Sequence, residues 1–173
     1  MKVFNNIYLI GMMGSGKSSI SKLLSHEINF KVREMDEMIE EKFGKTINDI
    51  FNEFGESEFR IVESLVLNSL NQEKMCIIST GGGVILENDF NKIKKSNAVI
   101  YLKYSPKYLF LNLNKSISNR PLLDEENLLN KINDLYKKRN LLYKRASNIV
   151  IDCDGKNLED IKIEILNIIT VQK

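Results

Sequence analysis

The sequence GMMGSGKSS occupies residues 11–19 and directly follows the apolar run IYLI at residues 7–10. Residues 11–18 match the pattern G-x-x-x-x-G-K-[ST], which is typical of loops that bind nucleotide phosphates between a buried strand and a helix. Glycine lets successive backbone N–H groups turn toward an anion, and the N-terminus of the following helix adds positive potential. The stretch predicts a site for a nucleoside triphosphate, with ATP as the first candidate, together with Mg²⁺.

Each part of this loop has an expected role. Lys17 is predicted to reach the β- and γ-phosphates, and the Ser18 hydroxyl is predicted to bind Mg²⁺. A glycine-rich turn with an incidental lysine is the alternative, but it does not explain why strand, turn, lysine, hydroxyl and helix follow in register. The predicted nucleotide-binding residues of the loop are Gly11, Gly14, Ser15, Gly16, Lys17, Ser18 and Ser19.

Composition and charge favour one soluble domain spanning residues 1–173. The chain is 43% hydrophobic and 28% charged, and it contains no apolar run of about 20 residues that could cross a bilayer. A net charge of +2 argues against a nucleic-acid partner. Cys76 and Cys153 lack the spacing of a redox or zinc site, and a single histidine, His26, excludes histidine triads and multi-histidine metal sites. We expect a cytoplasmic monomer that binds neither nucleic acid nor membrane.

Short apolar runs alternate with longer stretches of helical period. This alternation predicts an α/β fold with a parallel sheet of five strands, flanked by helices and joined by right-handed crossovers. The strands are predicted at residues 6–10, 30–33, 75–79, 98–102 and 148–152. The helices are predicted at residues 17–28, 35–43, 47–54, 56–70, 89–95, 106–113, 127–147 and 158–170. Residues 114–127 are polar and lack a clear period, so we expect a mobile lid there.

The class of nucleotide-binding protein follows by elimination. A GTP switch needs an N-K-x-D motif, and the Asn-Lys pairs at residues 91–92, 114–115 and 130–131 all lack the aspartate. Mechanical and nucleic-acid NTPases usually carry further domains or strongly basic surfaces. A compact kinase that acts on a small molecule remains.

Three clusters could hold the acceptor of the phosphate. Asp36 follows the second predicted strand, at the edge where parallel sheets bind ligands, although it could also be a plain acidic start of a helix. Arg60 and Glu63 lie three residues apart on one predicted helix, so the acid can orient the guanidinium; a surface ion pair is the alternative. The glycine triplet at residues 81–83 follows the third strand and exposes backbone N–H groups, unless it is only a flexible loop.

With these motifs in order, the chain resembles the shikimate kinase family over nearly its whole length. The resemblance implies a three-layer P-loop kinase fold, with residues 33–70 binding substrate and residues 114–127 forming the lid. It also implies ATP-dependent phosphorylation of the 3-hydroxyl of shikimate, a step of aromatic amino acid biosynthesis. The matching motifs are GxxGxGKS at residues 11–18, Asp36, FRxxE at residues 59–63, GGG at residues 81–83, RPLL at residues 120–123 and RNLLY at residues 139–143.

The resemblance assigns roles to individual residues. Lys17, Asp36 and Arg120 are the implied catalytic residues: Asp36 orients the 3-hydroxyl, and Arg120 comes down with the lid onto ATP. Two arginine forks suit a planar carboxylate better than lysine would. The residues implied to bind shikimate are Asp36, Arg60, Gly81, Gly82, Gly83 and Arg139.

The chain departs from the family pattern at two places. Glu34 stands where the family usually has aspartate, and this longer acid is expected to reach Mg²⁺ through water. The start of the lid lacks an arginine often found there, which leaves Lys156 as a weak candidate for the adenine contact. Another small-molecule kinase such as a gluconate kinase is the enzyme alternative, and a regulatory module that hydrolyses ATP without phosphate transfer is the alternative from a different class.

Overall fold

A computed structural model describes residues 4–116 and 125–171 of the chain. Its parallel sheet has the strand order β2-β3-β1-β4-β5, with β1 in the middle. Every predicted strand is present, and each boundary agrees with the prediction to within one residue. The strands are β1 (Asn6–Ile10), β2 (Lys31–Glu34), β3 (Cys76–Ser79), β4 (Ala98–Lys103) and β5 (Ile149–Asp152).

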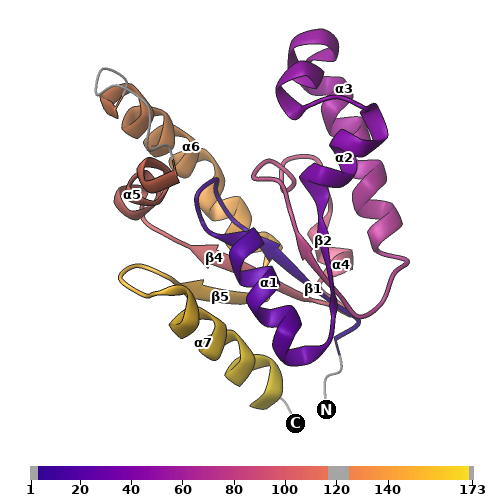
Figure 1. Cartoon of the computed structure of the whole chain (residues 1–173), viewed down its shortest axis with the longest axis vertical. Coiled ribbons are helices and arrows are strands. Elements are labelled where there is room, and N and C mark those ends of the chain that lie inside the picture. Colours follow the sequence, from indigo (N-terminus) through magenta and orange to yellow (C-terminus); the bar gives the residue numbers. More distant parts are fainter. Residues whose placement is uncertain (1–3, 117–124, 172–173) are drawn as a thin grey trace.

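Helices cover the sheet and extend beyond its carboxyl edge. The helices α1 and α7 pack against each other and against the strands on one face, whereas α2 pairs with α3 and α5 pairs with α6. Figure 1 shows these two pairs standing on either side of the phosphate-binding loop. The helices are α1 (Lys17–Ile28), α2 (Met35–Phe43), α3 (Ile47–Leu70), α4 (Phe90–Ile93), α5 (Pro106–Ser116), α6 (Glu125–Ala146) and α7 (Leu158–Val171).

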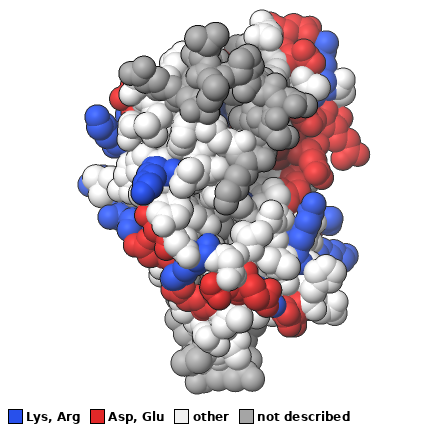
Figure 2. Space-filling model, turned by 60° about the vertical axis from the view of Figure 1, so that its left-hand side comes forward, with Lys and Arg blue, Asp and Glu red and all other residues white. Residues whose placement is uncertain are grey.

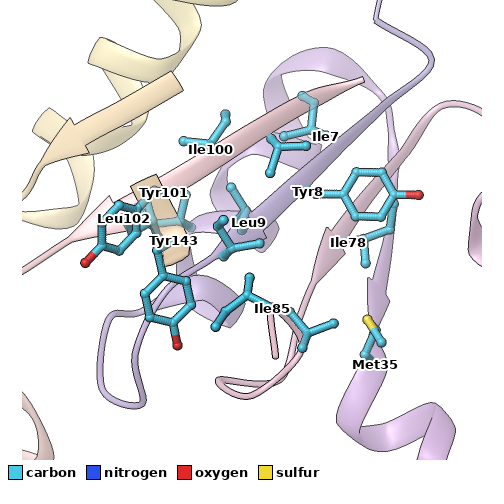
Figure 3. Packing of buried hydrophobic residues seen from close by; sticks show 14 of the residues in the cluster. Ile7, Tyr8, Leu9, Met35, Ile78, Ile85, Ile100, Tyr101, Leu102 and Tyr143 are labelled. Carbon is cyan, nitrogen blue, oxygen red and sulfur yellow. The ribbon is translucent and has the colours of Figure 1, made fainter. Parts of the chain in front are cut away.

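The central strand β1 is buried along its whole length. Figure 3 shows Leu9 and Tyr8 among apolar side chains from β3, β4 and the helices. Both faces of the strand must therefore be apolar, because helices cover both sides of a parallel sheet. Asn6 and Tyr8 are the polar exceptions. The Tyr8 hydroxyl donates to Asn71 Oδ1 at 2.6 Å, and Asn6 Nδ2 donates to the carbonyl oxygen of Glu73 at 2.9 Å. A strand fixed on both sides gives the loop after Ile10 a rigid base.

Two predicted helices are joined into α3. The backbone breaks at Gly55, where φ is 80° and ψ is 174°, so the predicted helices at residues 47–54 and 56–70 correspond to the two sides of one kink. The kink separates the segment that carries Phe54, whose ring packs against Phe43 of α2, from the segment that carries Arg60.

Both ends of the segment predicted as a lid lie in helices. Helix α5 continues to Ser116 and α6 begins at Glu125, so the ends of the predicted segment at residues 114–127 are helical. A helical end made of polar residues has no apolar period, which is why the sequence pattern did not mark it. Arg120 lies outside the described residues. Within the described residues, no helix is long and apolar enough to cross a membrane.

Candidate active site

The phosphate-binding loop depends on glycine at three positions. Gly11, Gly14 and Gly16 have φ angles of 150°, 77° and 75°, which residues with a Cβ rarely adopt. A Cβ on Gly11 would also lie 2.9 Å from the carbonyl oxygen of Leu102, on the neighbouring strand. The loop therefore lies tightly against the sheet, and α1 begins directly after it.

Lys17 lies across this loop. Its Nζ donates to the carbonyl oxygens of Gly11 and Met12, each at 3.0 Å. Burial lowers the pKa of Lys17 to about 8, although the nearby carboxylates of Asp36 and Glu34 oppose this shift. An ammonium group with few water contacts gains much from an incoming anion, so the position suits a phosphate.

Ser18 and Glu34 form an oxygen cluster at the start of α1. The Ser18 hydroxyl donates to Glu34 Oε2 at 2.8 Å, and Ser21 donates to Glu34 Oε1 at 3.2 Å. The Ser79 hydroxyl lies 3.3 Å from that of Ser18. In the parts of the chain that are described, no three His, Cys, Asp or Glu side chains gather as a metal site. Hydroxyl and carboxylate oxygens fit Mg²⁺, which usually takes only one or two protein ligands besides water and phosphate.

Asp36 lies at the first turn of α2, beside the glycine triplet. Its Oδ1 is 3.0 Å from the position that a Cβ on Gly81 would take. The Asp36 side chain remains in contact with solvent, but the surrounding protein partly desolvates it, and this desolvation raises its pKa. The positive charge of Lys17 opposes the rise. A carboxylate close to Lys17 and close to the triplet can meet an acceptor hydroxyl between them.

Arg60 is held by two glutamates of the same helix. Its guanidinium donates to Glu63 Oε2 at 2.7 Å and to Glu56 Oε1 at 2.9 Å. The Glu63 side chain is only 1% exposed, so this ion pair is largely shielded from water. Burial raises the pKa of Glu63, and the Arg60 charge opposes the rise. A Cβ on Gly83 would lie 2.3 Å from both terminal nitrogens of Arg60, so the guanidinium rests directly on this glycine.

Arg139 contacts the triplet from the opposite side. Its Nη1 donates to the carbonyl oxygen of Gly82 at 3.2 Å, and Tyr143, one turn further along α6, donates to the same oxygen. The two arginines predicted to bind substrate thus contact neighbouring residues of one loop, from α3 and from α6.

Most predicted site residues gather at the carboxyl edge of the sheet. The face shown in Figure 2 carries both acidic and basic side chains. Lys156 forms an ion pair with Glu164 of α7, and its contact with adenine stays a prediction. The cysteines are free and buried, as expected for structural thiols.

Three contacts of the site were not predicted. Ser21 donates to the carboxylate of Glu34, the Ser79 hydroxyl contacts that of Ser18, and Asn112 of α5 donates to the carbonyl oxygen of Gly14 at 3.1 Å. An isolated serine or asparagine forms no recognisable sequence motif. Only its position, after a strand or on a helix next to the loop, could have indicated a role in the site.

The loop, the parallel sheet and the arginines beside the triplet define a P-loop kinase that acts on a small anionic molecule. The model of the family described as shikimate kinase matches residues 13–170. The chain belongs to the shikimate kinase family.

Individual relatives agree with this assignment. A shikimate kinase of Thermodesulfovibrio yellowstonii is 38% identical over 93% of this chain and 92% of its own length. One from Dehalococcoides mccartyi is 41% identical over 95% of this chain and 93% of its own length. The resemblance inferred from the motifs is confirmed.

Solved structures of known proteins confirm the fold. A shikimate kinase from Acinetobacter baumannii in complex with shikimate has a TM-score of 0.87 and 34% identity, covering 99% of this chain and 96% of that one. A gluconokinase from Sinorhizobium meliloti has a TM-score of 0.61 at 15% identity, covering 99% of this chain and 95% of that one, which shows a shared fold only. The three-layer P-loop kinase fold predicted from the sequence is therefore correct.

Proposed function

We propose that the chain transfers the γ-phosphoryl group of ATP to the 3-hydroxyl of shikimate, giving shikimate 3-phosphate and ADP in aromatic amino acid biosynthesis. The observation that carries this proposal is the pair Arg60 and Arg139 on the glycine triplet, at the same sheet edge as the phosphate-binding loop. The shikimate bound to the Acinetobacter baumannii relative supports the same acceptor. We expect the enzyme to be cytoplasmic and monomeric.

The two arginines bind the carboxylate of shikimate. Charge-assisted hydrogen bonds from guanidinium to carboxylate are among the stronger polar contacts, and a planar fork fixes the orientation of the acid. Arg60 enters the site already positioned by Glu63 and Glu56, so little side-chain entropy remains to be lost on binding. The N–H groups of the triplet add donors for the hydroxyls.

Asp36 orients the acceptor hydroxyl and accepts its proton as the oxygen–phosphorus bond forms and the bond from phosphorus to ADP breaks. Its raised pKa brings the carboxylate nearer to the value that suits a proton acceptor, while Lys17 keeps enough positive charge close by for it to ionise. Lys17 turns from the loop carbonyls to the transferring phosphate and offsets its growing negative charge.

The Ser18 hydroxyl and, through water, the Glu34 carboxylate would hold Mg²⁺ with the nucleotide. The ion would neutralise negative charge on the phosphates. Ser79 and Ser21 keep the two oxygen ligands oriented by their hydrogen bonds. Arg120, which lies outside the described residues, is proposed to add positive charge when the lid closes.

A coupled assay of ADP release tests this function. Purified protein with ATP and Mg²⁺ is measured with shikimate, with gluconate and without acceptor. A rate that rises only with shikimate supports the proposal. Equal rates in all three arms would indicate a module that hydrolyses ATP without transfer, and a response to gluconate would indicate the other kinase.

A further inference from the structure

The hydroxyl of Tyr143, on one helix of the site, contacts two other segments of the site. It donates to the carbonyl oxygen of Gly82 in the triplet, and it lies 3.9 Å from the sulfur of Met12 in the phosphate-binding loop. Tyr143 itself belongs to α6, which also carries Arg139. The hydroxyl therefore joins the substrate loop, the phosphate loop and the helix of a substrate-binding arginine.

The position of this hydroxyl is fixed by packing. Tyr143 is fully buried, and its ring stacks on that of Tyr101 from β4 with centroids 5.0 Å apart. Figure 3 shows Tyr101 and Tyr143 near each other, to the left of Ile85. The Tyr101 hydroxyl has a different partner, because it donates to Asn140 Oδ1 at 3.1 Å. A ring held in this way can place its hydroxyl with little freedom of movement.

The same carbonyl oxygen accepts from Arg139 Nη1 at 3.2 Å. Arg139 and Tyr143 are four residues apart and so share one face of α6. Burial raises the pKa of Tyr143 to about 12, and Arg139 opposes the rise, so the hydroxyl stays a proton donor at neutral pH. The Gly82 carbonyl oxygen is thus held by two donors from one helix turn.

Gly82 lies next to the phosphate-binding loop. A Cβ on Gly82 would be in ordinary van der Waals contact with the backbone nitrogen of Met13 at 3.5 Å and with the carbonyl oxygen of Gly11 at 3.7 Å. Turning the carbonyl away from Tyr143 would also turn the N–H of Gly83, because both belong to one planar peptide. Positioning the Gly82 carbonyl therefore also positions the N–H of Gly83.

We propose that Tyr143 is a positioning residue for substrate binding, whose hydroxyl fixes the Gly82–Gly83 peptide and, through the shared carbonyl, the side chain of Arg139. This inference rests on the proposed function for the identity of the ligand. It assigns to Tyr143 a role in shikimate affinity and none in the binding of ATP.

Tyr143→Phe removes the hydroxyl and keeps the stacked ring, and Tyr101→Phe is the matched control. Loss of one hydrogen bond to a buried carbonyl is expected to raise the KM for shikimate by about 3- to 10-fold. The KM for ATP should stay within about twofold, because Met12 is only a weak acceptor. Tyr101→Phe should leave both values within about twofold. An unchanged shikimate KM in Tyr143→Phe, or equal rises of both KM values in both variants, would overturn the proposal.

A second measurement needs no substrate. Amide hydrogen exchange should be faster at residues 81–86 in Tyr143→Phe than in the unmodified protein, since Val84 and Leu86 donate to carbonyls of the triplet. Tyr101→Phe should not show this local change. If exchange is faster in Tyr143→Phe but the unmodified protein does not phosphorylate shikimate, the positioning role is supported. Shikimate would then be excluded as the acceptor. Unchanged exchange at these residues would contradict the positioning role itself.

Discussion

Replacing Gly83 by alanine tests how closely the triplet fits Arg60. The new Cβ would lie 2.3 Å from both terminal nitrogens of the guanidinium and 2.5 Å from its Cζ. Because ordinary contacts to a Cβ begin near 3.4 Å, the guanidinium would have to move by about 1 Å. It is not free to do so without loss, since Glu63 and Glu56 hold it at 2.7 and 2.9 Å.

The displaced guanidinium of Arg60 loses its aligned hydrogen bonds to the shikimate carboxylate. Hydrogen bonds to charged groups contribute about 1.5 to 3 kcal/mol, which corresponds to a kcat/KM for shikimate lower by roughly 10- to 150-fold in Gly83→Ala. The KM for ATP should change by less than about threefold, because Arg60 does not contact the phosphate loop. Steady-state kinetics with each substrate varied in turn measure both effects.

Gly82→Ala is the control for any general effect of a methyl group in the triplet. Its Cβ would meet no atom closer than 3.5 Å, and neither Gly82 nor Gly83 has a positive φ. Gly82→Ala should therefore lose much less activity than Gly83→Ala, with thermal unfolding confirming that both variants are folded. Equal losses in the two variants, or unaltered kinetics in Gly83→Ala, would refute the reasoning.

Three further substitutions or conditions test other parts of the site. Asp36→Asn should keep its affinity for nucleotide and lose on the order of 10²- to 10⁴-fold in kcat, and turnover close to normal would remove Asp36 from the mechanism. Arg139→Ala should raise the KM for shikimate through the loss of about 1.5 to 3 kcal/mol, whereas an unaltered value would argue for another binding mode. Burial lowers the pKa of Lys17 to about 8, and a bound triphosphate should raise it again. ATP binding slightly above that pH should therefore take up protons, which calorimetry in buffers of different ionisation enthalpy detects; no uptake would contradict the contact.

Much of the fold could be predicted because local and long-range requirements agree in this chain. The glycine loop needs a buried strand before it and a helix after it, and both elements carry clear periods. The predicted boundaries of strands and helices were wrong where backbone geometry determines them. Met75 has a φ of 58°, so the third strand begins at Cys76, one residue later than predicted. The predicted end of α5 and the predicted start of α6 were wrong because polar helical turns resemble loops in a sequence.

The site could be predicted where a residue type has few other uses. Three consecutive glycines after a strand indicated close approach, and Arg60 indeed lies against Gly83. Tyr143 ends the RNLLY motif, but no role was predicted for its hydroxyl, because a buried tyrosine on an amphipathic helix is usually a core residue. Its hydroxyl acquires a role only when α6 places it against a loop 61 residues earlier in the chain. Contacts of this kind depend on the fold and cannot be derived from spacing.

A crystal structure of the protein with shikimate and a nucleotide tests the central claim most directly. The account predicts the carboxylate of shikimate between Arg60 and Arg139, with the 3-hydroxyl within hydrogen-bonding distance of Asp36 and facing the phosphates on the glycine loop. Shikimate bound elsewhere, or bound with its carboxylate turned away from both arginines, would contradict it.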